Sequence, residues 1–137
     1  MFIVKYDPAG NVVWAKSAGG TESDVSRAIT FDNTGNIYIT GEFSSPTISF
    51  GTFTLTKSAS SSMVTDYFIA KYDAAGNVFW ASSSGSGGWE GGNSIFADPS
   101  GNIYVTGYFD MMITLGTNTL ISSEEKKTET YVSSQVL

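Results

Sequence analysis

Apolar residues occur in short runs along the chain, and each run ends at a cluster of Gly, Asp, Asn or Ser. In 37–43, isoleucine and phenylalanine alternate with tyrosine, threonine and glutamate. A period of two residues is that of a β-strand, and no long segment shows helical spacing. Runs of this kind lie at 2–6, 12–15, 28–31, 37–43, 68–72, 78–81 and within 94–109. The sequence therefore predicts an all-β chain of short strands.

The pattern D-x-x-G-N separates pairs of these runs and occurs four times, beginning at Asp7, Asp32, Asp73 and Asp98. The Asp side chain can bond back to its own backbone, and Gly tolerates a positive φ, so each copy predicts a tight hairpin turn. A calcium loop would need several carboxylates at alternate positions, whereas each turn offers one. We interpret these turns as structural, and we expect no metal site.

The chain repeats itself with a period of 66 residues: 2–43 and 68–109 share 22 identical positions in 42, without a gap. A fixed period of this size indicates a repeat architecture. The long segments 44–66 and 110–130 contain a weaker echo, 48–55 against 113–120, shifted by 65. We expect these echoes to be short extended pieces inside long loops.

Strands joined alternately by tight turns and long loops predict an antiparallel meander of four strands, here 28–31, 37–43, 68–72 and 78–81. Because the chain reverses at each connection, all the D-x-x-G-N turns should lie on one rim and the variable loops on the opposite rim. Neither face of 37–43 is plainly polar, so we expect each sheet to be covered on both sides. Four-stranded sheets packed face to face around an axis, as in a β-propeller, achieve this.

Three spaced motifs, F-I-[VA]-K-Y-D-x-A-G-N-V-x-W-A, I-x-x-D-x-x-G-N-I-Y-[IV]-T-G-x-F and F-G-T-x-T-L, resemble the bacterial β-propeller repeats called SBBP, over nearly all of 2–120. The resemblance implies an extracellular or cell-surface protein that scaffolds or binds, with no shared catalytic residue. The apolar run at the start of the chain is too short for a signal peptide.

The positions at which the repeats are cut predict how the chain assembles. Residues 2–15 supply the last two strands of a blade, 27–81 a complete blade, and 94–109 the first two strands of another. Residues 121–137 form a divergent tail, in which the third strand keeps only a Tyr and an apolar neighbour and no fourth strand follows. Two blades cannot close a ring within one chain. We therefore expect a head-to-tail homo-oligomer, a trimer or a tetramer; the rival interpretation is a truncated piece of a larger surface protein.

Charge and composition exclude several classes of function. Thirteen acidic and seven scattered basic residues give a net charge of −6, so neither nucleic acid nor an acidic membrane surface is expected as a partner. Nothing in the sequence could span a bilayer. His and Cys are both absent, which removes the commonest general base and the thiol nucleophile. We expect no cofactor and no enzymatic activity; cleavage of a glycoside by the pair Glu22 and Glu90 is the least favoured reading.

The candidate ligand site lies on the variable rim. Trp89 stands in a Gly-rich loop and could stack on a sugar face while Glu90 accepts hydrogen bonds from hydroxyl groups. Alternatively, Trp89 packs under its loop or at a subunit contact. Five further polar residues should lie near the same rim: Glu22, Asp24, Glu42, Tyr108 and Asp110. Two classes of function remain open, a glycan-binding lectin and a scaffold or interaction protein.

Overall fold

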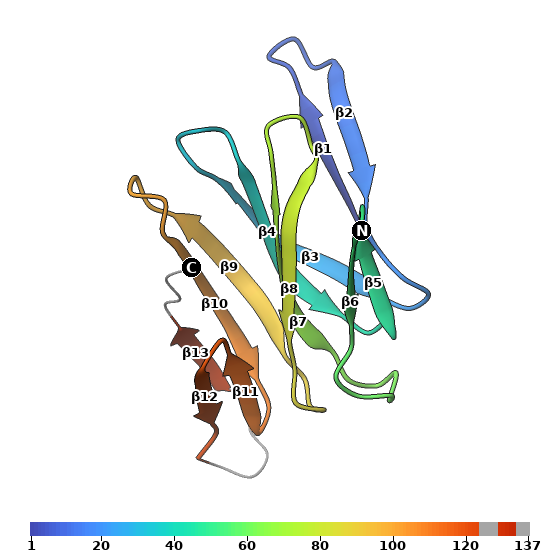
Figure 1. The fold of residues 1–137 in the computed structure, drawn as a ribbon, viewed down its shortest axis with the longest axis vertical. Coiled ribbons are helices and arrows are strands. Elements are labelled where there is room, and N and C mark those ends of the chain that lie inside the picture. The colour runs from blue at the N-terminus through green and yellow to red at the C-terminus, as the bar shows by residue number, and fades with distance from the viewer. Residues whose placement is uncertain (124–128, 134–137) are drawn as a thin grey trace.

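The computed structural model describes residues 1–123 and the backbone of 129–133 (Figure 1). The described residues form β-strands, turns and loops without any helix, and every strand pair in the sheets is antiparallel. The predicted all-β, antiparallel fold class is therefore confirmed.

The central sheet has four strands in chain order. They are β3 (Asp24–Phe31), β4 (Ile37–Phe43), β7 (Asp66–Tyr72) and β8 (Val78–Ser84). Neighbours in the sheet are neighbours along the chain, apart from the small hairpin inserted between β4 and β7, so the sheet is a meander. Each of its strands contains β-branched and aromatic residues, which favour the extended conformation and suit a pleated sheet covered on both faces.

Smaller sheets flank the central one. On one side lies the hairpin of β1 (Phe2–Tyr6) and β2 (Val12–Ser17), and on the other a sheet in the order β13-β10-β9. The latter is built from β9 (Gly91–Ala97), β10 (Ile103–Phe109) and β13 (Glu129–Ser133).

The strand β13 corrects the expectation that no sound third strand follows β10. Phe109 pairs with Glu129 on β13 in the way that Phe43 pairs with Asp66 in the central sheet. Pairing between strands uses backbone groups, so it does not require the Phe-Ile pattern that the tail lacks. The remaining tail residues, 124–128 and 134–137, lie outside the described residues.

Both long loops fold into two-stranded hairpins. The first consists of β5 (Thr47–Phe50) and β6 (Phe53–Thr56), and the second of β11 (Met112–Leu115) and β12 (Asn118–Ile121). The first hairpin buries Ile48 and Phe50 completely, and the Phe50 ring lies 5.1 Å from that of Phe68 in β7. The expected extended pieces thus pair with each other and cover the sheet.

The D-x-x-G-N turns lie together at the upper end of Figure 1. In the turn at Asp32, the carboxylate accepts hydrogen bonds from the backbone N–H groups of Thr34 and Asn36 at 2.9 and 3.0 Å, and from both of their side chains. The Gly has a φ of 82–89° in all four copies. Burial opposes ionisation of Asp32, but the hydrogen bonds from Thr34 and Asn36 outweigh it and hold its pKa well below the ordinary value.

The core consists of two apolar layers, one on each face of the central sheet. The first layer joins that sheet to the β1–β2 hairpin and to β5–β6 through residues such as Ile3, Ile39 and Phe43. The second joins it to β9 and β10 through residues such as Tyr38 and Ile95. In β4, Tyr38 and Ile39 are neighbours and face opposite layers, so this strand is covered on both sides, as its sequence predicts.

Replacing Asp32 by Ala should lower the free energy of unfolding by about 1 kcal/mol, because several turn N–H groups lose their common acceptor. Acid should have the same effect on the native chain. Its stability should fall as the pH drops below about 4, where the unfolded Asp binds a proton more readily than the folded one. Urea unfolding of native and variant chains at neutral and acidic pH measures both effects, and equal acid sensitivity of the two would contradict the assigned role of Asp32.

Candidate functional site

The seven candidate residues fall on two different junctions between sheets. Asp24 begins β3 and Glu22 precedes it, so both lie between the β1–β2 hairpin and the central sheet. The others lie where the central sheet meets β9 and β10: Glu42, Trp89, Glu90, Tyr108 and Asp110. The sequence places all seven on one rim, but the structure brings only the second group together.

Glu42 is bonded within the protein at both carboxylate oxygens. Arg27 donates from Nη2 to one oxygen at 2.5 Å and from Nε to the other at 3.1 Å, and the Tyr108 hydroxyl also donates to that second oxygen. The ion pair with Glu42 raises the pKa of Arg27, whereas burial, with help from Glu42, raises the pKa of Tyr108 to about 12. A β-carbon at Gly91 would overlap the Glu42 carboxylate, so β9 can approach only because it has glycine there. This cluster binds two sheets together, and both oxygens of the largely buried Glu42 carboxylate are engaged within the protein.

Glu90 is 0% exposed and lies beneath the loop that carries Trp89. Its Oε1 accepts hydrogen bonds from the Ser86 hydroxyl at 2.6 Å and the Ser86 N–H at 3.3 Å. Its Oε2 has no hydrogen-bond partner among the described residues. Burial, together with the negative charge of Asp66, raises the pKa of Glu90 to about 7. The side chain therefore cannot accept hydrogen bonds from a sugar above Trp89 unless the loop opens.

The equivalent residue of the first repeat explains the unpaired oxygen. Asp24 stands 66 positions before Glu90, and its carboxylate accepts hydrogen bonds from the Gly20 N–H and from both the N–H and the hydroxyl of Ser45. In the second repeat the position of Ser45 is taken by Met111, whose backbone has a φ of 60°. The side-chain hydroxyl that helps to satisfy Asp24 is therefore missing at the equivalent position beside Glu90.

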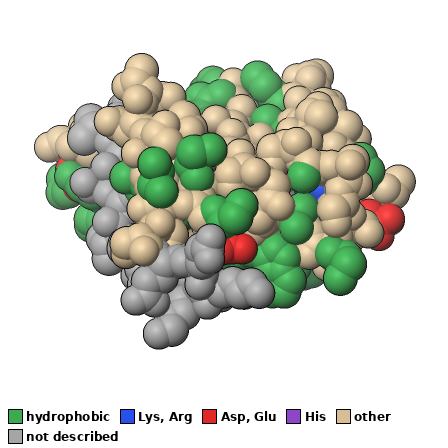
Figure 2. Space-filling model, turned by 90° about the horizontal axis from the view of Figure 1, so that it is seen from below, with side chains coloured by type: hydrophobic (Ala, Val, Ile, Leu, Met, Phe, Trp, Pro, Cys, Tyr) green, Lys and Arg blue, Asp and Glu red, His purple; other side chains and the backbone are tan. Residues whose placement is uncertain are grey.

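Trp89 is 54% exposed, while its backbone is held in place. It forms a β-bridge with Thr65, and the neighbouring Glu90 N–H donates to the Thr65 carbonyl at 2.9 Å. Figure 2 views this end of the molecule, where apolar side chains lie in separate groups between polar atoms. The indole therefore does not pack under its loop, and both ligand stacking and a subunit contact stay predictions.

Sequence reasoning missed several residues that build the rim. Lys57 is buried and donates from Nζ to the carbonyls of Ser44 and Ser61 at 2.6 and 2.5 Å, which holds the loop before β7. Asp66 accepts from the N–H and hydroxyl of Ser58. A lysine or aspartate in a polar loop carries no pattern that distinguishes it from a solvent-exposed residue, so only the fold identifies these two.

The described residues do not bring the proposed catalytic pair together. Glu22 and Glu90 belong to different junctions, which removes the basis for pairing them in glycoside cleavage. Within the described residues, no group of three or more acidic side chains is placed to hold a metal ion. The same part of the chain contains no helix with the length and apolar character that a membrane crossing requires.

Glu90 should make the stability of the chain depend on pH near neutrality. The unfolded side chain loses its proton near pH 4.5, but the folded one does so at about 7, so the free energy of unfolding should fall as the pH rises between these values. Glu90→Gln should remove most of this fall and should stabilise the chain above pH 7. Urea unfolding across this pH range measures it; a variant that keeps the full pH dependence of the native chain would refute the role of Glu90.

Comparison with known proteins agrees with this architecture. Residues 13–42, which include most of β2, all of β3 and all of β4 except its last residue, match the family model of the beta-propeller repeat, SBBP. The chain is also 32% identical over 139 residues to an uncharacterized WD repeat-containing protein, L264, of Acanthamoeba polyphaga mimivirus. That alignment covers 96% of this chain but 10% of the relative, so the chain spans about a tenth of the relative's length. Both matches favour a protein built from repeats. Residues 13–42 thus match one repeat of the SBBP β-propeller family, within an all-β chain of antiparallel sheets.

Proposed function

We propose that this protein is a non-enzymatic binding or scaffold module outside the cell, which assembles head to tail with further copies of itself and presents its long-loop rim to partners. The extracellular location rests on the resemblance to SBBP repeats alone. The proposed assembly rests on the two-stranded β1–β2 sheet, whose outer edge is unpaired among the described residues. The main observation is the different exposure of two equivalent residues, Ile29 and Ile95.

Ile29 and Ile95 occupy the same place in the two repeats, 66 residues apart, but Ile29 is 58% exposed and Ile95 is 8% exposed. Ile95 lies in β9, which packs on β3 of the central sheet. Ile29 lies in β3 itself, whose other face should meet the first two strands of a preceding blade. The β1–β2 hairpin supplies only the last two strands of that blade. A groove of about 260 Å³ remains there, lined in part by Phe2, Val4 and Ile29.

The outer edge of β1 offers backbone groups to a further strand. Met1 and Ala18 exchange both backbone hydrogen bonds, so Ile3 and Lys5 also bond to β2, whereas Phe2 and Val4 direct their N–H and C=O groups outward. In the described part of the chain no strand pairs with this edge. Such an edge is a site for strand addition.

A second copy of the chain fits this edge through its β9 and β10. In the central sheet the residue equivalent to Phe2 is Phe68, whose carbonyl accepts a hydrogen bond from the Thr40 hydroxyl at 2.8 Å. Thr106 of β10 is the counterpart of Thr40 and could make this bond to Phe2. The outer face of β9 carries Phe96, which is 59% exposed and would cover Ile29.

This assembly requires β13 to leave β10. Tyr131 pairs with Gly107 in β10 as Phe68 pairs with Gly41 in β4, so β13 occupies the place that β1 of a second copy would take. The proposal therefore includes an exchange of β13 for the incoming β1. In the rival interpretation, a truncated piece of a larger surface protein, a preceding repeat of the same chain covers β1 instead.

Light scattering tests the assembly. The chain of 14.6 kDa should have the mass of a trimer or a tetramer, and Val4→Pro should reduce it to a monomer, because Pro removes an outward N–H without breaking a bond to β2. Val4→Thr keeps the N–H and the branched side chain, and should assemble as the native chain does. A native chain that stays a folded monomer at high concentration would overturn the assembly and favour the larger array.

The exposed indole of Trp89 supports a second candidate function, a glycan-binding lectin. Trp89→Ala should abolish binding on a glycan array, because the stacking surface is lost while the buried residues beneath it remain. Phe79→Ala removes an exposed aromatic side chain from β8, away from the rim, and is the matched control. If the native chain binds no glycan, or if Trp89→Ala binds as well as the native chain, the lectin function is wrong and the scaffold remains.

A further inference from the structure

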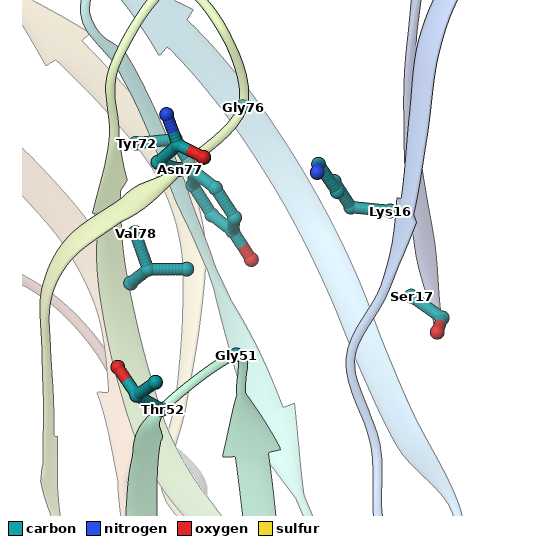
Figure 3. A pocket seen from close by; sticks show the side chains of 8 residues that line it. All are labelled: Lys16, Ser17, Gly51, Thr52, Tyr72, Gly76, Asn77 and Val78. Carbon is teal, nitrogen blue, oxygen red and sulfur yellow. The ribbon is translucent and has the colours of Figure 1, made fainter.

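A separate cavity of about 270 Å³ lies between the β1–β2 hairpin and the central sheet. Its walls come from three places: Lys16 in β2, Gly51 and Thr52 in the β5–β6 turn, and Tyr72 with Gly76 at the β7–β8 turn. Figure 3 shows the Tyr72 hydroxyl and the Lys16 ammonium both directed into the space between β2 and the β7–β8 turn. Neither the rim residues nor the edge of β1 line this cavity.

Among the described residues that line the cavity, Tyr72 offers a hydroxyl group without a partner. Its side chain is 2% exposed, yet its hydroxyl has no hydrogen-bond partner among the described residues. Among the described residues, the fully buried polar atom without a partner is Glu90 Oε2, so the Tyr72 hydroxyl keeps some accessible surface and can meet a ligand there. The cavity is the space that this hydroxyl faces. Burial raises the pKa of Tyr72 to about 12, so near neutral pH the hydroxyl keeps its proton and can donate it.

Lys16 gives the cavity its charge. Among the described residues its ammonium group makes neither an ion pair nor a hydrogen bond. Asp73, the carboxylate in the adjoining turn, does not line the cavity and is bonded to the N–H groups of Ala75 and Asn77. The cation is therefore available to a ligand.

The walls are held in place before any ligand binds. The β5–β6 hairpin is anchored by the buried Ile48 and Phe50. At the opposite wall, a β-carbon on Gly76 would lie 3.0 Å from the Trp14 ring and 3.1 Å from Lys16 Cε, so glycine lets these side chains rest on the turn. A preformed wall lowers the entropy lost on binding.

We propose that this cavity binds a compact oxyanion of carboxylate size, with Lys16 neutralising its charge and the Tyr72 hydroxyl donating a hydrogen bond to it. A donor and a cation on opposite walls match an anion that carries several acceptor oxygens. The volume lies just below the usual range for small-molecule pockets, which favours a small group over a whole sugar chain. At the second junction Ser82 takes the place of Lys16, so the described chain builds one such site. The proposal does not depend on assembly or on the rim.

Titration of the ¹⁵N-labelled full chain tests the site. Sodium acetate should shift the amide resonances of Gly51, Thr52 and Gly76 with saturation, whereas acetamide, which has a similar shape but no charge, should not. Sulfate and phosphate form parallel arms that distinguish a carboxylate site from one for larger oxyanions, and sodium chloride at equal ionic strength controls for screening.

Two variants assign the binding to the named groups. Lys16→Gln should weaken acetate binding roughly tenfold or more, and Tyr72→Phe should weaken it severalfold without loss of the fold, because each removes one charged or polar contact. Lys5→Gln removes the same charge from the neighbouring strand, where Lys5 donates to the Ala74 carbonyl, and should leave binding unchanged. Equal shifts with acetate, acetamide and chloride, or unchanged affinity in both cavity variants, would overturn the proposal.

Discussion

The structure depends on a sheet that is apolar on both faces. In β4, neighbouring residues such as Tyr38 and Ile39 point to opposite sides, and each is buried in a different layer. Such a strand cannot be stable with one face in water, because each uncovered apolar side chain loses the free energy of its burial. The two flanking sheets and the hairpins of the long loops supply that cover. Stacking therefore determines the order of the sheets, the position of the rims and the unfinished face at β3.

The two junctions use one backbone plan but different polar chemistry. At the first, Asp24 is satisfied by donors from Gly20 and Ser45, and these hydrogen bonds fix the loop. At the second, a longer acid, Glu90, lies under the loop with one oxygen unpaired, and its pKa is raised to about 7 by burial. Conversely, the first junction has Lys16 beside its cavity, whereas the second has Ser82 at the equivalent position. The two repeats thus share a backbone fold but differ in the polar side chains at their junctions.

Much of the fold could be predicted from local pattern. The D-x-x-G-N turns and the alternating strands indicate the meander and its two rims, because turn geometry and side-chain alternation are local properties. The prediction that no sound third strand follows β10 is wrong, because β13 pairs through its backbone and needs no sequence match. The site was predicted less well. Glu90 and Asp24 look like rim acids in sequence, but their burial depends on loops that close over them, and the position of Tyr72 opposite Lys16 depends on three segments that meet only in the fold.

Hydrogen exchange of individual backbone amides tests most directly whether stacking stabilises each sheet. If cover on both faces decides local stability, the amides of β4 and β7 should exchange most slowly, and those of the β1–β2 hairpin, which lacks a neighbour on its outer face, should exchange much faster at low protein concentration. At high concentration, protection should rise at the outward amides of Phe2 and Val4. If the β1–β2 hairpin exchanges as slowly as β4 at every concentration, the stacking account is contradicted.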